Sequence, residues 1–215
     1  MAALKACSAL VSGANRGLGL EMVKQLLEAC CSNIFAACHD PDGPNSEVSI
    51  QEFRISAKKV GSLLGKNGLN LLVNNATVLP QKTMLTATVE DMQNTFNTNV
   101  IGALFVIREY LPYLRTAAKA SGKPGMSCDK AAVINISTDS ASMSFMPVLK
   151  EPFPFFPYSI SKAPKNTKIV LMCFKKHNLY VRVTEMLCPL TYYAVSQQHE
   201  TPIIGSLLAV QSMYC

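Results

Sequence analysis

The sequence has 215 residues, of which 49% are hydrophobic and 16% charged, with a net charge of +6 from 20 lysines and arginines against 14 aspartates and glutamates. This composition excludes a disordered chain and predicts one globular domain over residues 1–215. No stretch is long and apolar enough to cross a bilayer, and the N-terminus lacks a cleavage-type ending, so we expect a cytoplasmic protein without a membrane partner. The basic residues are scattered and no nucleic-acid-binding motif occurs, so we expect no nucleic-acid partner.

Cysteine and histidine usage gives no sign of a metal centre. The eight cysteines lie mostly inside apolar runs and form no C-x-x-C pair, so we expect reduced, buried thiols. The three histidines, His39, His177 and His199, are isolated from one another in the sequence. We therefore expect no metal site.

The first part of the chain alternates strand and helix patterns. Residues 4–11 form a short apolar run that predicts a strand, and the next segment has the spacing of a helix. A second strand is expected over residues 33–38, followed by the turn-rich residues 39–44. The first helix is expected to bury one face, made of Leu20, Val23, Leu27 and Cys30.

The alternation continues to about residue 187. A helix pattern over residues 46–64 leads to a strand over 69–74, and a long helix then ends near Pro112. Further on we expect a strand over residues 131–136, a helix from about Pro157 and a strand over 180–187. The faces expected to be buried consist of Ile50, Phe53, Ala57, Val60 and Leu64 in the second helix, and of Met92, Phe96, Val100, Ala103, Ile107 and Tyr110 in the long helix.

Strands that alternate with helices predict an α/β fold with a parallel sheet and right-handed crossovers. The second strand lies to one side of the first, and the chain must then cross back past the first strand to form the third. The handedness of that crossover places the second helix on the opposite face from the first helix. The result is a doubly wound, Rossmann-like sheet, whose ligand crevice lies at the carboxyl ends of the strands where the winding reverses.

A glycine turn over residues 12–19, Ser-Gly-Ala-Asn-Arg-Gly-Leu-Gly, follows the first strand. Glycines let the backbone approach a pyrophosphate closely, and the start of a helix attracts an anion. A tight turn without a ligand can have the same spacing, but the flanking strand and helix favour a dinucleotide. Arg16 could pair with a 2′-phosphate and so select NADP(H), whereas Asp40, near the end of the second strand, leaves NAD(H) open.

Four further motifs follow this turn in order: Asn74-Asn75-Ala76, Asn99-Val100-Ile101-Gly102, Asn135-Ile136-Ser137-Thr138 and Tyr158-x-x-x-Lys162. With these motifs the chain resembles the short-chain dehydrogenase/reductase family over about residues 4–190. It looks most similar to the Sniffer-like and C-signal-like carbonyl reductases. The resemblance implies NADP(H)-dependent reduction of a small-molecule aldehyde or ketone to an alcohol. It also implies pairing through the long helices as a homodimer.

The Tyr-Lys motif suggests how a carbonyl would be reduced. Because Tyr158 and Lys162 are four residues apart on a helix, they share a face, and the ammonium can lower the phenol pKa from about 10 toward neutrality. Tyr158 would then protonate the carbonyl oxygen as hydride arrives from the nicotinamide. The resemblance implies that Lys162 also binds the ribose hydroxyls, that Asn99 holds a proton-relay water and that Thr138 binds the substrate oxygen. The cofactor-binding residues that it implies are Gly13, Asn15, Arg16, Gly17, Leu18, Gly19, Asn75, Ala76, Tyr158 and Lys162.

The sequence also departs from the family pattern in its strands. The usual third strand has no counterpart between residues 38 and 69, and residues 195–215 form a divergent, truncated tail without the usual final strand. We therefore expect the second strand and the strand over 180–187 to be exposed sheet edges.

Other departures concern single residues near the motifs. Thr77 stands where the family has glycine, and threonine fits poorly if that position needs a positive φ. Pro164 is expected inside the helix that carries Tyr158, at a cost of about 3 kcal/mol or a kink. Leu190 and Ala194 replace a glycine and a threonine of the pattern. These departures favour an alternative, a degenerate relative that keeps the fold as a binding or scaffold protein, whereas the intact Tyr158, Lys162 and Asn99 favour a reductase.

Overall fold

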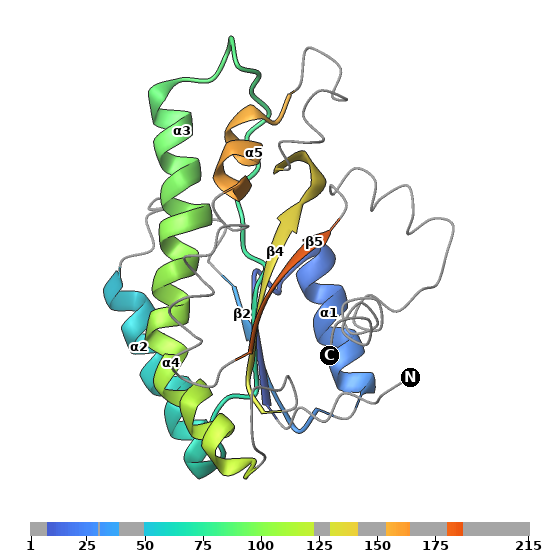
Figure 1. Cartoon of the computed structure of the whole chain (residues 1–215), viewed down its shortest axis with the longest axis vertical. Helices are drawn as coiled ribbons and strands as arrows, with labels where there is room; N and C mark the ends of the chain where they lie inside the picture. Colours follow the sequence, from blue (N-terminus) through green and yellow to red (C-terminus); the bar gives the residue numbers. More distant parts are fainter. Residues whose placement is uncertain are drawn as a thin grey trace.

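A five-stranded parallel sheet forms the centre of the molecule (Figure 1). The computed structural model describes residues 8–29, 31–38, 50–122, 130–141, 154–163 and 180–186. The strand order is β2-β1-β3-β4-β5, with every neighbouring pair parallel. The strands are β1 (Ser8–Ser12), β2 (Asn33–Ala37), β3 (Leu71–Asn74), β4 (Ala132–Thr138) and β5 (Tyr180–Met186). This order confirms the predicted doubly wound, Rossmann-like fold.

Helices cover both faces of the sheet. Figure 1 shows α1 on one side, and α2 and α4 side by side on the other, which confirms the predicted placement of the first two helices. None of the helices within the described residues is long and apolar enough to cross a membrane. The helical segments are α1 (Gly17–Glu28), α2 (Ile50–Leu64), the 3-10 turn η1 (Gly65–Asn67), α3 (Val89–Phe96), the π-helix η2 (Asn97–Gly102), α4 (Ala103–Ala120), the 3-10 turn η3 (Asp139–Ala141) and α5 (Phe156–Lys162).

The alternation of side chains along the strands produces two cores. Leu10, Leu72 and Val133 pack with α2 and α4, while their strand neighbours Val11 and Val73 pack with α1. β3 and β4 are buried along their whole length, as expected for central strands of a sheet covered on both faces. Each fully buried leucine contributes roughly 1.5–3 kcal/mol to the stability of the fold, and these cores therefore hold the strand ends in place.

The predicted buried face of α1 was only partly correct: Val23 is half-buried against the core, but the fully buried residues are others. Met22 and Leu26 are buried together with Gly19, whereas Leu20 is 39% exposed and Leu27 is 62% exposed. Cys30 lies outside the described residues. Apolar residues of α1 lie on several faces of the helix, so the sequence pattern fits more than one orientation. The close approach of the first turn of α1 to the glycine turn selects the orientation that is observed.

The predicted end of the long helix near Pro112 was also wrong. Pro112 lies inside α4, which continues to Ala120. Leu114 and Ala117, which follow the proline, are buried in the core between α4 and the sheet. The burial of this last part of α4 outweighs the roughly 3 kcal/mol penalty of an interior proline.

The π-helix η2 between α3 and α4 changes which side chains face the sheet. A π-helix adds a residue to a turn, so the positions before and after it are out of phase with one helical stripe. Ile107 and Tyr110 are buried as predicted, but Phe96, which precedes η2, is 42% exposed. Asn99, inside η2, is fully buried.

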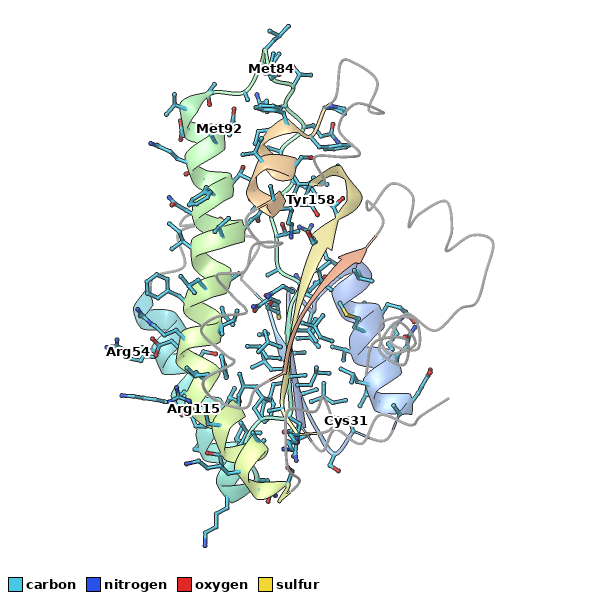
Figure 2. All side chains as sticks on the ribbon, in the orientation of Figure 1. Cys31, Arg54, Met84, Met92, Arg115 and Tyr158 are labelled. Atoms are coloured by element: carbon cyan, nitrogen blue, oxygen red, sulfur yellow. The ribbon has the colours of Figure 1, made fainter. Side chains whose placement is uncertain are left out.

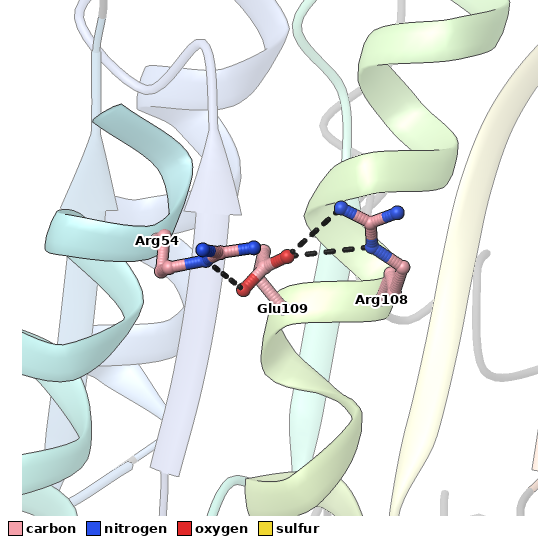
Figure 3. Close-up of polar contacts among 3 residues, drawn as sticks. All are labelled: Arg54, Arg108 and Glu109. Atoms are coloured by element: carbon pink, nitrogen blue, oxygen red, sulfur yellow. Dashed lines mark hydrogen bonds and ion pairs between the residues drawn. The ribbon is translucent and has the colours of Figure 1, made fainter. Parts of the chain in front are cut away.

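The helices α2 and α4 pack closely on their shared side of the sheet. The ring of Tyr113 lies against Gly61, where an added Cβ would come within 2.2 Å of the ring carbon Cζ. On α4, Glu109 accepts hydrogen bonds from Arg108 and forms an ion pair with Arg54 of α2, 3.7 Å between Nε and Oε2 (Figure 3). The predicted buried positions of α2 that fall on described side chains, Ala57, Val60 and Leu64, do belong to this contact.

β2 and β5 are the outer strands of the described part of the sheet. The segments in which the family's further strands are expected, residues 39–49 and 187–215, lie outside the described residues, as do Pro164, Leu190 and Ala194. Within the described part, α5 begins at Phe156 with Pro157 in its second position and ends at Lys162.

Candidate active site

The predicted site residues gather at the carboxyl edge of the sheet. Because all five strands are parallel, their carboxyl ends lie at the same edge. The glycine turn follows β1, Asn75 and Ala76 follow β3, and Thr138 ends β4. Figure 2 shows Tyr158 on α5 beside the carboxyl end of β4, and Cys31 at the opposite edge.

Hydrogen bonds join the glycine turn to the loop after β3. Asn75 Nδ2 donates to the carbonyl oxygens of Ser12 (3.0 Å) and Gly13 (3.2 Å). In return, Ser12 Oγ accepts from the backbone N–H groups of Asn75 (3.0 Å) and Ala76 (3.1 Å). These bonds hold the turn in one conformation. Ser12 was missed by the sequence reasoning, although it directly precedes the first glycine.

At the start of α1, the space beside Gly17 is not filled by any described residue. Arg16, the N-cap residue, makes no side-chain capping bond, and the first turn contains no acidic residue. Gly17 has φ +52°, and among the described residues nothing lies within 4 Å of where its Cβ would be. The N–H groups of a helix start carry partial positive charge and need acceptors. An anionic phosphate would satisfy both the charge and the space.

Gly19 is required for a different reason from Gly17. An added Cβ at Gly19 would lie 2.1 Å from the Gly13 carbonyl oxygen and 2.7 Å from Asn75 Nδ2. Real Cβ contacts are not this short, so a side chain here would push α1 away from the turn. The absence of a side chain lets the helix start approach the strand ends closely.

The remaining predicted residues of the turn lie at its surface. Asn15 and Arg16 are exposed and Leu18 is half-buried. The N–H of Ala14 donates to the carbonyl oxygen of Ala37 (3.2 Å), which ties the turn to the end of β2. Arg16 therefore projects from a turn anchored at the edge of the sheet where Cys38 follows β2. Asp40 lies outside the described residues.

Tyr158 and Lys162 lie on the inner side of α5 and are both buried. Lys162 is fully buried, and its Nζ donates to the Ile136 carbonyl oxygen of β4 at 3.0 Å. The same Nζ is 5.2 Å from the centre of the Tyr158 ring. The structure thus brings the ammonium and the phenol ring together, with β4 as the support.

A group of buried hydroxyls lies beside this pair. Thr138 Oγ1 and Ser140 Oγ are 3.2 Å apart and share a hydrogen bond, and Ser159 Oγ donates to Ser140 Oγ at 2.9 Å. All three residues are buried. Thr138 was predicted as a site residue from the sequence, whereas Ser140 and Ser159 were not. The position of Ser159 directly after Tyr158 was the available signal.

Asn99 is held by the loop after β3 and by α5. Its Oδ1 accepts from Thr77 Oγ1 (2.8 Å) and from the Val78 N–H (2.9 Å). Its Nδ2 donates to the Val78 carbonyl oxygen (3.0 Å) and to Ser161 Oγ (2.9 Å). One buried amide therefore connects the loop after β3, the π-helix η2 and α5.

Residues 8–195 match the family model of the short chain dehydrogenases. The chain belongs to the short-chain dehydrogenase family. Solved structures of carbonyl reductases share its fold. A carbonyl reductase from chicken fatty liver, solved with NADPH bound, is 32% identical with a TM-score of 0.72, over 83% of this chain and 78% of that chain. The putative carbonyl reductase Sniffer of Caenorhabditis elegans is 28% identical with a TM-score of 0.71, over 82% of each chain.

Curated relatives agree with this membership of the short-chain dehydrogenase family. The short-chain dehydrogenase/reductase AacuF of Aspergillus aculeatus is 24% identical in an alignment 185 positions long, which covers 74% of this chain and 64% of that protein. A tropinone reductase homologue of Arabidopsis thaliana is 28% identical in an alignment 135 positions long, which covers 55% of this chain and 50% of that protein. The chain thus spans between half and two-thirds of the length of the curated relatives it matches.

Proposed function

We propose that this chain reduces an aldehyde or ketone to an alcohol with NADPH, and that Tyr158 is the general acid. The proposal rests on the arrangement of groups at the carboxyl edge of the sheet. There, the space beside Gly17 at the start of α1 is not filled by any described residue, and the N–H groups of this helix start are uncapped by described side chains, on the same edge as the buried Tyr158 and Lys162. The similarity to a carbonyl reductase solved with NADPH supports the same cofactor.

The residues of the glycine turn fit the chemistry of a dinucleotide. The backbone from Gly13 to Gly19 would hold the pyrophosphate, and the exposed Arg16 would pair with a 2′-phosphate. When bound, the cofactor supplies the hydride. NAD(H) lacks the 2′-phosphate, so a preference for NADPH would depend on Arg16.

The proton would come from the protein. Tyr158 would donate its phenolic proton to the carbonyl oxygen of the substrate, and the nearby ammonium of Lys162 would stabilise the phenolate that remains. Because the Ile136 carbonyl oxygen orients that ammonium, its charge stays close to the ring. Thr138 would hold the substrate oxygen through its hydroxyl. Asn99 would support a proton-relay water through its backbone carbonyl oxygen, because Thr77, Val78 and Ser161 occupy its side-chain amide.

The first test is a titration of the purified chain with NADPH, followed by cofactor fluorescence, with NADH in parallel. We expect binding that prefers NADPH, and we expect Arg16→Ala to remove the preference. A folded chain that binds neither dinucleotide at millimolar concentration would refute the proposal. It would favour the alternative of a relative that retains the fold without turnover.

Two glycine variants separate the phosphate site from backbone strain. Gly17 and Gly65 have similar left-handed conformations, φ +52° and +57°, and in both cases no described atom lies within 4 Å of an added Cβ. An alanine at either position should cost about 1–2 kcal/mol of folding free energy. We expect only Gly17→Ala to weaken NADPH binding, because Gly65 lies at the end of α2. Equal binding by the two variants would contradict a phosphate site at the start of α1.

The role of Tyr158 is tested by Tyr158→Phe, which keeps the buried ring and removes the hydroxyl. We expect NADPH affinity within about twofold of wild type and carbonyl reduction slower by roughly 100-fold or more, the usual contribution of a general acid. Retention of wild-type turnover would exclude Tyr158 as the proton donor.

A homodimer through the long helices is part of the same proposal. Phe96, Ile101 and Leu104, in and beside η2, are all more than one-third exposed. Apolar side chains exposed together are typical of a protein interface. Sedimentation of wild type and of Leu104→Asp would test this, and a wild-type monomer at all concentrations would refute it.

A further inference from the structure

Thr77 stands where the family pattern has glycine, and its hydroxyl contacts the candidate active site. Thr77 Oγ1 donates to Asn99 Oδ1 at 2.8 Å, with the Val78 carbonyl oxygen a more distant partner at 3.5 Å. Glycine has no side chain with which to make this bond. The threonine therefore adds a hydrogen bond to Asn99 that the usual residue cannot provide.

The amide of Asn99 is fully used by its neighbours. An amide has two donor hydrogens and two acceptor lone pairs. Its Oδ1 accepts from Thr77 and Val78, and its Nδ2 donates to Val78 and Ser161. Exchange of the oxygen and nitrogen would set the NH2 group against the Val78 N–H. This set of bonds therefore selects one orientation of the amide.

Ser161 continues the connection to the helix of the general acid. Its Oγ accepts from Asn99 Nδ2 and donates to the Tyr158 carbonyl oxygen at 2.7 Å. Ser161 and Asn99 are both buried, so water does not compete freely for these bonds. A path of hydrogen bonds thus runs from the Thr77 loop, through the π-helix η2, to the backbone of α5.

We propose that Thr77 is a positioning residue that acts through Asn99. Thr77 and Ser161 hold the amide from two sides. The loop that borders the glycine turn and the helix that carries Tyr158 therefore stay at a fixed distance from each other. The proposal rests on the proposed function, because it concerns the distance between the cofactor side and the acid side of that site. Without the Thr77 hydroxyl, Asn99 Oδ1 keeps only the Val78 N–H as a donor, and the buried amide is held less firmly on the side of the loop.

The kinetic test compares three threonine variants in the full chain. Thr77→Val removes the hydroxyl with little change of shape, Thr77→Ser keeps it, and Thr86→Val is the matched control. Thr86 is exposed in the same connection and bonds within its own turn to Thr83. We expect Thr77→Val to lower kcat roughly twofold to tenfold, as for the loss of one hydrogen bond to an acceptor that keeps the Val78 N–H, with the NADPH Kd within about twofold. Thr77→Ser should restore kcat, and Thr86→Val should leave it unchanged. An unchanged kcat in Thr77→Val, or no rescue by serine, overturns the proposal.

An unfolding cycle separates this proposal from the proposed function. Urea unfolding is measured for wild type, Thr77→Val, Ser161→Ala and the double variant. Because both residues act on one amide, we expect the change in the unfolding constant of the double variant to differ from the product of the single changes by about threefold or more. A wild type that binds no NADPH refutes the proposed function. The unfolding cycle still tests whether Thr77 and Ser161 act together on Asn99. Multiplicative effects of the two substitutions overturn the proposal for Thr77.

Discussion

Replacement of Gly19 by alanine tests whether the start of α1 must lie against the glycine turn. An added Cβ would lie 2.1 Å from the Gly13 carbonyl oxygen and 2.7 Å from Asn75 Nδ2. Neither neighbour can easily retreat, since Asn75 Nδ2 already donates to the carbonyl oxygens of Ser12 and Gly13. We therefore expect the first turn of α1 to move outward.

The size of the effect follows from two opposing contributions. Alanine is more favourable than glycine inside a helix by about 1 kcal/mol. Overpacking against fixed atoms costs about 1–3 kcal/mol, and occasionally more. Because the shortest contact is with backbone, we expect the upper part of this range and a net loss of about 2 kcal/mol in the free energy of unfolding. The displaced helix start should also weaken NADPH binding about tenfold, the equivalent of losing its favourable interaction with an anion.

Urea unfolding followed by circular dichroism measures the first effect, and cofactor fluorescence measures the second. Gly102→Ala is the matched control, because Gly102 is also helical and its added Cβ would meet the Asn97 carbonyl oxygen at an ordinary 3.4 Å. We expect this control to gain up to about 1 kcal/mol and to keep the NADPH affinity. If Gly19→Ala is as stable as wild type and binds NADPH equally, the close packing of α1 is not what requires glycine.

Three further predictions concern the helices. Gly61→Ala should lose about 1–3 kcal/mol of unfolding free energy because its Cβ would meet the Tyr113 ring, and in a Tyr113→Ala background the same change should instead gain about 1 kcal/mol; a loss in both backgrounds would contradict this. Hydrogen bonds from the backbone and hydroxyl of Thr88 lower the pKa of Asp91 below 3.8, so its contribution to stability is present above that pH and is lost as the pH falls through the lowered pKa. Unfolding of Asp91→Asn should therefore differ from wild type at neutral pH and converge with it in acid, and a difference that persists at pH 2 would argue against this cause. Glu109→Gln should lower stability by about 0.2–1 kcal/mol at low salt and by less at high salt, since Arg54 and Arg108 are largely exposed; a salt-independent loss would exclude ion pairing as the reason.

Local patterns were sufficient to predict the order of the described strands and which residues gather at the candidate site. A strand, a glycine turn and a helix in succession specify a doubly wound sheet and its carboxyl edge, because connection handedness leaves few alternatives. The spacing of Tyr158 and Lys162 put both on one helix face, as the structure has them. The buried side of α2 was predicted correctly at Ala57 and Leu64, which lie on one stripe of the helix, although Ile55 and Leu63 are exposed outside it.

Only the tertiary structure determined the features that depend on contacts between segments far apart in the sequence. The orientation of α1 depends on the approach of Gly19 to Gly13, which the apolar residues around the helix do not reveal. α4 continues past Pro112 because the residues after it are buried against the sheet, and that burial lies outside any local window. The contact of Thr77 with Asn99 joins segments 22 residues apart and depends on the π-helix that turns Asn99 inward. The sequence alone thus determined which elements form and in what order, while packing between distant elements determined which faces are buried and which polar groups meet.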